Sequence, residues 1–97
     1  MDIINAKLLF DFAKNNPNAA GAINRWVEIV KTEKWKHHND LKQTFPQADY
    51  VGNNRYVFNI AGNNYRLVAA AVFFAGALHI RFIGTHAQYD KIDCSTI

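Results

Sequence analysis

The stretch Tyr56–Val68, with the sequence YVFNIAGNNYRLV, decides the fold. Aromatic and β-branched residues fill both of its ends, and Gly62-Asn63-Asn64 between them is a typical hairpin connection. Further runs of the same kind follow it along the chain. The pattern predicts three strands, over Arg55 to Ala61, Tyr65 to Ala75 and Leu78 to Gly84. We therefore expect an antiparallel meander in the second half of the chain.

The first third of the chain has helical periodicity instead. Apolar residues recur every fourth position at Ile4, Leu8 and Phe12, and Asp2 is expected to cap this helix. A second helix is expected from Pro17, with an apolar stripe of Ile23, Trp26, Val27 and Val30. Two short amphipathic helices cannot bury such stripes alone. The predicted fold is α+β: two N-terminal helices on one face of an antiparallel sheet of three to four strands.

Between these halves, residues 34 to 54 are expected to form a polar connector. Its cations and histidines are Lys34, Lys36, His37, His38 and Lys42. One helical turn is expected over Asp40 to Phe45, because Pro46 disfavours a helical conformation in the residue before it.

Composition limits the class of protein. The chain has 97 residues, which suits one domain spanning 1–97 with one hydrophobic core. Cys94 is the single cysteine, so no intramolecular disulfide is possible and a reducing cytoplasm is expected. No signal peptide or membrane span is predicted. Neither a metal-ligand spacing nor a Gly-rich phosphate loop is present, and we expect no metal or cofactor.

Positive charge is unbalanced in the strand-rich half. The net charge is +3, and no Asp or Glu occurs from Tyr50 to Tyr89. If both hairpins have two-residue loops, positions 55, 57, 59, 66, 68, 70, 72, 79, 81 and 83 share one sheet face. Arg55, Arg66 and Arg81 then lie together, which favours a polyanionic ligand.

Beyond the last strand, polar groups concentrate in Phe82–Lys91 (FIGTHAQYDK). Cleavage of RNA at its 2′-hydroxyl requires proton transfer and stabilisation of charge on the phosphate. Histidine suits the first task, and arginine suits the second. His86, Tyr89, Arg66 and Arg81 are therefore the candidate catalytic residues of a metal-free ribonuclease.

Each of these residues has a structural alternative. His86 can cap a strand end, Tyr89 can anchor the C-terminal turn, and the arginines can form a solvated sheet face. His37 and His38 point in different directions and have no accompanying ligand set, so a solvent or phosphate contact is favoured over a metal. The residues alone therefore indicate a basic α+β domain that binds nucleic acid.

Two segments resemble the HigB branch of the RelE-type toxins. They are Tyr56–Val68, with its N-x-Y-R-L strand, and Ile80–Asp90, which ends in T-H-x-x-Y-D. The resemblance extends over roughly residues 20 to 92. It implies an mRNA interferase toxin of a type II toxin–antitoxin pair that cuts mRNA in the ribosomal A site without a metal. It also implies a HigA-like helix-turn-helix antitoxin, through which operator DNA would be contacted.

The resemblance also suggests roles for individual residues. Arg66 and Arg81 match strand positions that hold the scissile phosphate, and His86 and Tyr89 match the acid–base and stacking positions. The expected RNA-binding residues are Arg55, Asp90, Lys91, Lys42 and Lys36. Two other functions remain open: inhibition of DNA gyrase by a toxin of the same fold, and a non-catalytic module that binds RNA or a protein partner.

Overall fold

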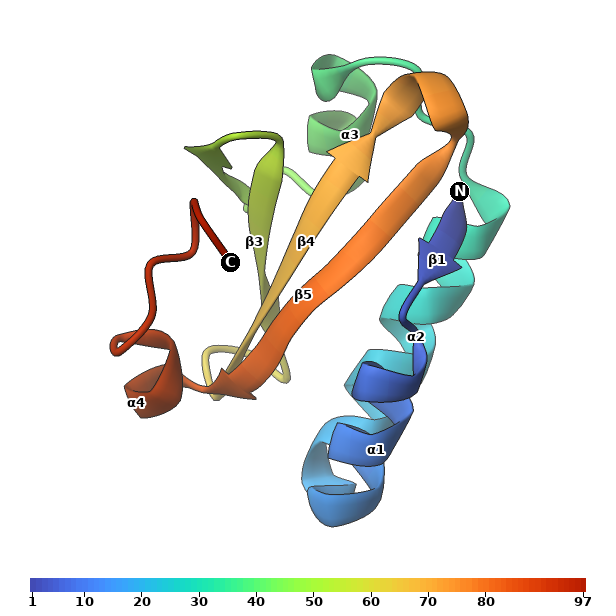
Figure 1. Ribbon diagram of the computed structural model, residues 1–97. Coiled ribbons are helices and arrows are strands. Elements are labelled where there is room, and N and C mark those ends of the chain that lie inside the picture. The colour runs from blue at the N-terminus through green and yellow to red at the C-terminus, as the bar shows by residue number, and fades with distance from the viewer.

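A five-stranded sheet organises the molecule, which a computed structural model describes over residues 1–97 (Figure 1). The strands are β1 (Asp2–Ile4), β2 (Asp49–Gly52), β3 (Arg55–Ile60), β4 (Tyr65–Val72) and β5 (Ala77–Thr85). The helices are α1 (Lys7–Asn15), α2 (Pro17–Thr32), α3 (His38–Thr44) and α4 (His86–Tyr89), with a 3₁₀ turn η1 (Phe73–Ala75). The α+β class and the pair of N-terminal helices agree with the prediction.

The sheet is larger than predicted and is mixed. Its order is β1-β5-β4-β3-β2, and β1 runs parallel to β5 while the other neighbours are antiparallel. The predicted sheet of three to four antiparallel strands was therefore wrong in strand number and in this one pair. β1 has three residues and β2 has four, which is too short for a period-two pattern to be visible in the sequence.

The start of the first helix also differs from the prediction. Asp2 belongs to β1 rather than to a helix cap, and α1 begins at Lys7. Asn5 separates the two elements with φ +67°, a left-handed conformation that asparagine tolerates. Its side-chain Nδ2 donates to the backbone oxygen of Ile80 at 3.3 Å, which ties this turn to β5.

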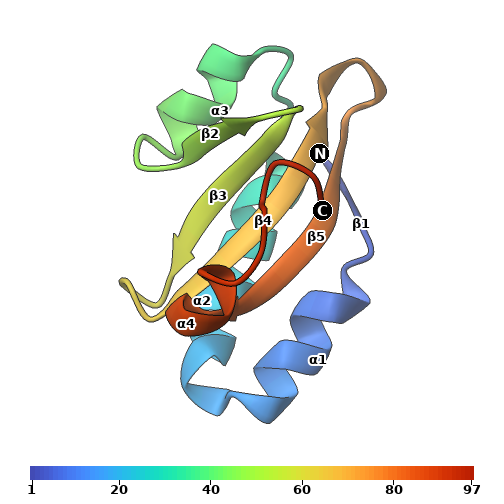
Figure 2. The same ribbon diagram turned by 60° about the vertical axis from the view of Figure 1, so that its left-hand side comes forward.

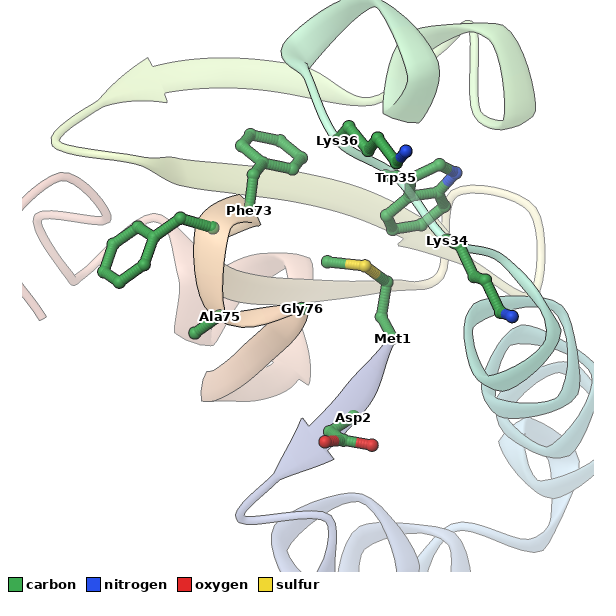
Figure 3. Close-up of a pocket in the computed structure, with 9 residues that line it drawn as sticks. Met1, Asp2, Lys34, Trp35, Lys36, Phe73, Ala75 and Gly76 are labelled. Atoms are coloured by element: carbon green, nitrogen blue, oxygen red, sulfur yellow. The ribbon is translucent and has the colours of Figure 1, made fainter.

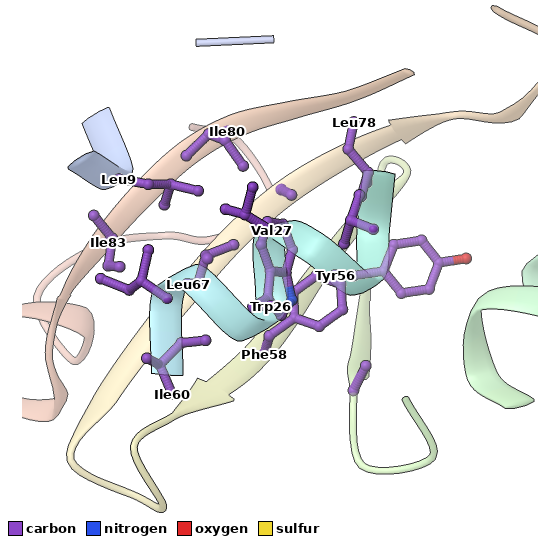
Figure 4. Close-up of a cluster of buried hydrophobic side chains, with 14 of the residues drawn as sticks. Leu9, Trp26, Val27, Tyr56, Phe58, Ile60, Leu67, Leu78, Ile80 and Ile83 are labelled. Atoms are coloured by element: carbon purple, nitrogen blue, oxygen red, sulfur yellow. The ribbon is translucent and has the colours of Figure 1, made fainter. Parts of the chain in front are cut away.

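The hydrophobic core lies between the sheet and α1 and α2 (Figure 4). Trp26 and Val27 of α2 face Phe58, Leu67 and other apolar side chains of the central strands. The Trp26 and Phe58 rings meet edge to face, with centroids 5.2 Å apart. One cluster of 19 buried residues includes the whole predicted stripe of α2, so both halves of the chain contribute to a single core.

Two four-residue loops keep the predicted sidedness of β3 and β4. Ile60 pairs with Tyr65, and Val72 pairs with Ala77, so each loop has an even number of residues, like the two-residue loops assumed in the prediction. The side chains that directly follow each loop therefore keep their predicted faces. Positions 55, 57 and 59 therefore lie on one face together with 66, 68, 70 and 72. His79 is on this face too, because it pairs with Ala70.

A β-bulge in β5 overturns the predicted sidedness of its second half. Val68 pairs with Phe82, but Ala69 pairs with Ile80, so Arg81 is an extra residue. Phe82 consequently shares the face of Val68, whereas Ile83 joins the core; simple alternation predicts the opposite side for both. No loop signal marks this bulge in the sequence.

The connector is more ordered than expected. Its helix α3 spans His38–Thr44 rather than Asp40 to Phe45, and the last part of the connector forms β2. The Asp40 carboxylate accepts hydrogen bonds from the backbone N–H groups of Lys36 and His37 at 2.9 and 3.2 Å. These bonds fix the start of α3. None of the helices is long and apolar enough to cross a membrane.

Candidate active site

The sheet face turned away from α1 and α2, here called the distal face, carries the candidate site. Its strand residues include Arg55, Val57 and Asn59 of β3 and Arg66 and Val68 of β4. α1 and α2 lie on one side of the sheet, and α4 and the C-terminal segment (residues 92–97) lie on the other (Figure 1). Figure 2 shows this segment crossing in front of β4.

Helix α4 begins where β5 ends because Thr85 and Gln88 satisfy its first backbone groups. The Thr85 N–H donates to Gln88 Oε1 at 2.9 Å, and the Gln88 N–H donates to Thr85 Oγ1 at 3.2 Å. Gly84 leaves room for this arrangement, since a Cβ there would lie 2.6 Å from Gln88 Oε1 and 2.7 Å from Phe82 Cζ. The turn directs His86 and Tyr89 to the same side, with ring planes 17° apart and centroids 6.4 Å apart.

Tyr89 is the most perturbed group of the site. Its hydroxyl lies 3.5 Å from Cys94 Sγ, and this contact, together with burial and the charge of Asp49, raises the pKa of Tyr89 to about 12. The positive charge of Arg66 acts in the opposite direction on the same pKa. Tyr89 therefore keeps its proton at neutral pH and lies close enough to Arg66 and Asp49 to sense both charges.

Asp49 is a member of this group that sequence reasoning missed. It pairs with Val57 across β2 and β3, which brings its carboxylate to the distal face near Tyr89. The sequence places it in a polar connector, 40 residues from Tyr89. Only the pairing of the short strand β2 brings the two residues together.

Arg66 and His86 have few fixed partners. Arg66 Nη1 donates to the backbone oxygens of Asn63 and Tyr65 at 3.1 and 3.4 Å, which leaves its other guanidinium nitrogens without a protein partner. His86 Nε2 lies 3.8 Å from Asp90 Oδ1, and both side chains are more than half exposed. Such an exposed pair contributes little to stability and leaves both groups accessible to a ligand.

The C-terminal segment covers the part of the distal face around Arg55. Arg55 directs Nε and Nη2 to the Ile97 oxygen at 3.0 and 2.6 Å, and Asn53 Nδ2 donates to the Ser95 oxygen at 2.8 Å. Val57 and Val68 are at most 3 % exposed although neither belongs to the helix-side core. The guanidinium of Arg55 thus makes the two-donor contact that it would otherwise offer to a phosphate.

The remaining predicted residues have different surroundings. Lys42 is occupied, because its Nζ donates to the Pro46 oxygen at 2.8 Å and to the Ala48 oxygen. Arg81 is exposed on the bulge, three residues before Gly84, which is the partner of Arg66. Lys91 is exposed next to α4, while Lys36 lies at the start of α3. No group of three or more His, Cys, Asp or Glu side chains is arranged to hold a metal ion.

Comparison with known proteins adds an independent finding. Residues 19–92 match the model of HigB_toxin, described as the RelE-like toxic component of a toxin–antitoxin system. A protein named mRNA interferase HigB from Escherichia coli O6:H1 is 29% identical over 94 residues, covering 95% of this chain and 91% of that protein. The mRNA interferase toxin HigB of Escherichia coli K12 is 32% identical over 93 residues, covering 93% and 88%. A Shigella flexneri protein named mRNA interferase HigB matches to the same extent.

Proposed function

The chain belongs to the HigB family of RelE-like toxins, and from this premise we propose that it is a toxin that cleaves mRNA as an endoribonuclease. The names of its relatives support mRNA as the target rather than DNA gyrase. Residues 1–97 would form a single toxin domain. A toxin of this family has an antitoxin partner, and we expect a HigA-like helix-turn-helix protein that carries the contact with operator DNA. We place its action in the cytoplasm, at the ribosomal A site.

The observation that supports the chemistry best is the grouping of Tyr89, Arg66, Asp49 and His86 on the distal face. We propose that the 2′-oxygen of one nucleotide attacks the adjacent phosphorus and that the bond to the 5′-oxygen breaks. The products are a 2′,3′-cyclic phosphate and a free 5′-hydroxyl. In this step, one proton leaves the 2′-hydroxyl and one proton reaches the departing 5′-oxygen.

The environment of each side chain suggests its role. Tyr89 holds its proton at neutral pH, so it cannot serve as the base, but it can give that proton to the departing 5′-oxygen; its ring can also stack on a base. We assign acceptance of the 2′-proton to His86, whose ring lies beside that of Tyr89 and whose side chain is more than half exposed. Arg66 and Arg81 would stabilise the charge that develops on the phosphate oxygens, which is usually the largest catalytic contribution. These groups supply every proton and charge that the step requires, so no metal is invoked.

The test is growth arrest on expression, together with mapping of mRNA ends. We expect Arg66→Ala and His86→Ala each to relieve the arrest and to abolish cleavage. Arg25→Ala is the matched control, because Arg25 is exposed on α2, on the other side of the sheet. Fully toxic Arg66→Ala and His86→Ala variants would refute the site, whereas a parent protein that arrests growth without cutting mRNA would refute the function.

A further inference from the structure

A second concave site lies away from the distal face, between α3, the β2–β3 pair and η1. It has a volume of about 480 Å³. Its walls are the four rings of His38, Tyr50, Tyr56 and Phe73, and its rim carries Lys36 and Asn54. The size is within the range typical of small-molecule pockets. Nothing in the proposed cleavage step uses these residues.

The rings pack against one another in a continuous cluster. Tyr50 and Tyr56 have centroids 5.1 Å apart, and His38 lies 5.7 Å from Tyr50 and 5.5 Å from Tyr56. Tyr56 is almost completely buried, whereas Tyr50 is 51% exposed. The exposed part of Tyr50 is therefore available for stacking with a planar group.

Two hydrogen bonds hold these rings in place without a ligand. His38 Nδ1 and the Tyr56 hydroxyl are 2.6 Å apart. The hydroxyl of Tyr50 accepts from the backbone N–H of Asn54 at 3.4 Å, across the turn that joins β2 to β3. Binding would consequently require little additional ordering of the protein, which favours affinity.

The charge of this aromatic pocket favours an anion. Lys36 lies on its rim and forms no salt bridge, and no carboxylate contributes to the lining. Asp40 lines an adjacent hollow that also includes Lys36. Its carboxylate accepts from backbone N–H groups and interacts with the charges of Lys36 and His37, which offsets part of the positive charge at the pocket. His37 adds a second basic side chain to the lining.

A neighbouring cavity shares Lys36 and Phe73 but has a different character. It measures about 550 Å³ and is lined by five hydrophobic residues and Gly76 together with Asp2, Lys34 and Lys36 (Figure 3). Its charges are mixed, because Asp2 lies there with two lysines, and Phe74 in its lining is 97% exposed. The two cavities thus provide an internal comparison, because each has an exposed aromatic ring and only one is free of acids.

Neighbouring residues of β3 face the distal face and the aromatic pocket. Arg55 points to the distal face, whereas Tyr56, the next residue, points to the pocket, because neighbouring side chains of a strand alternate. β2 is the last strand of the sheet at this edge. A single-stranded chain that displaces the C-terminal segment from Arg55 can therefore turn around this edge and reach Tyr50.

We propose that the aromatic pocket binds one nucleotide of single-stranded RNA, with the base stacked on Tyr50 and a phosphate paired with Lys36. Aromatic rings beside cations are the usual means by which proteins bind single-stranded nucleic acid. This inference rests on the proposed function to the extent that RNA is the ligand. The site would extend the contact beyond the nucleotides at the scissile bond.

The test uses a fluorescently labelled 2′-O-methyl oligoribonucleotide, which lacks the attacking hydroxyl and so reports binding without cleavage. We expect Tyr50→Ala to weaken binding roughly five- to a hundredfold, which corresponds to the stacking of one base. Tyr50→Phe keeps the ring and should bind like the parent. Lys36→Gln should weaken binding and reduce the slope of log affinity against log salt by about one.

The matched control is Phe74→Ala, which removes the exposed ring of the neighbouring cavity, where an acid and two lysines lie together, and should leave binding unchanged. If Tyr50→Ala binds as tightly as the parent while the parent cleaves mRNA, the pocket assignment is wrong and the proposed function stands. If the parent neither cleaves mRNA nor binds the oligonucleotide, both are wrong. Adenosine 5′-monophosphate gives a direct check, because it should shift the NMR signals of the Tyr50 and His38 rings.

Discussion

At the scale of single residues, Tyr89 connects the C-terminal segment to the candidate site. Its hydroxyl contacts Cys94 and senses charges of opposite sign on Asp49 and Arg66. Of these influences, the contact with Cys94 raises the pKa of Tyr89 most. The lone cysteine therefore affects the alkaline behaviour of the protein.

Replacing Cys94 by alanine should lower the pKa of Tyr89 from about 12 toward 10.0. A raised pKa stabilises the folded state fully below the unfolded-state value and less as pH rises through the folded-state value. The unfolding free energy of the parent should therefore decline between about pH 10 and 12, and more shallowly in Cys94→Ala. Tyrosinate absorbance, compared with Tyr89→Phe, measures the pKa. Tyr56 also has a raised pKa, but this residue is present in both the parent and Cys94→Ala, so its effect is the same in the two proteins.

Cleavage near neutral pH should be unaffected by Cys94→Ala, because Tyr89 remains protonated in both proteins. A large loss of mRNA cleavage in a folded Cys94→Ala variant would contradict this, and would instead indicate that the cysteine positions the phenol. An unchanged titration of Tyr89 would show that burial and the charge of Asp49, rather than Cys94, raise its pKa.

Some site residues were predictable from the sequence, and one was not. His86 and Tyr89 could be selected because histidine and tyrosine three residues apart follow an apolar run. Their proximity to Arg66 follows from the sidedness of β4, since Arg66 lies on the face that α4 adjoins. Asp49 could not be selected, because its position depends on the four-residue strand β2, whose pairing with β3 is not encoded in a local pattern.

At the scale of elements, Gly84 lets α4 pack against the end of β5. Gly84→Ala would place a methyl group within 2.7 Å of both Gln88 Oε1 and Phe82 Cζ. Gln88 would have to leave Thr85, or the Phe82 ring would have to move. We expect this variant to lose about 1–3 kcal/mol of unfolding free energy, as in other overpacked sites, and to lose cleavage activity as His86 and Tyr89 shift.

Gly21→Ala is the matched substitution for Gly84→Ala. Gly21 lies inside α2 and is exposed, and no atom comes within 4 Å of the position that a Cβ would take there. Alanine at this position should add about 0.5–1 kcal/mol, because glycine in a helix loses more backbone entropy. Urea denaturation measures both changes. Equal effects of the two variants would mean that the contacts of Gly84 do not constrain α4.

The bulge in β5 is the place where period-two alternation fails to predict which side of the sheet a residue faces. The period-two rule correctly assigned every tested position of β3 and β4, because both hairpin loops have even length. It failed at Phe82 and Ile83, because Arg81 adds one residue without any Gly or Pro signal. Leaving Arg81 outside the ladder lets Ile83 fill the core, and this tertiary preference overrides the local alternation.

At the scale of the whole molecule, the C-terminal segment lies across the surface that the proposed function assigns to RNA. Removal of residues 93–97 would free Arg55 and Asn53, which now bind the backbone oxygens of Ile97 and Ser95. We expect this truncation to tighten binding of the 2′-O-methyl oligonucleotide several-fold. Adding Arg55→Ala to the truncated protein should reverse part of that gain, because it removes the phosphate contact.

Fluorescence anisotropy provides the measurement, and circular dichroism confirms that the truncated protein is folded. Weaker binding after truncation would contradict the prediction, since it would mean that the segment forms part of the RNA site.

The overall α+β arrangement was predictable from hydrophobic periodicity. The path of this segment was not, because its last five residues, DCSTI, have neither a strand nor a helix period.

The contact between Arg55 and the Ile97 oxygen has a consequence for selectivity. A tethered competitor has a high and constant effective concentration, and it blocks every RNA to the same degree. The apparent dissociation constant of each RNA is its intrinsic value divided by the fraction of molecules in which the site is uncovered. The segment would therefore raise the apparent dissociation constant of every transcript by one common factor. The order of affinities among transcripts would depend on RNA contacts made elsewhere on the protein.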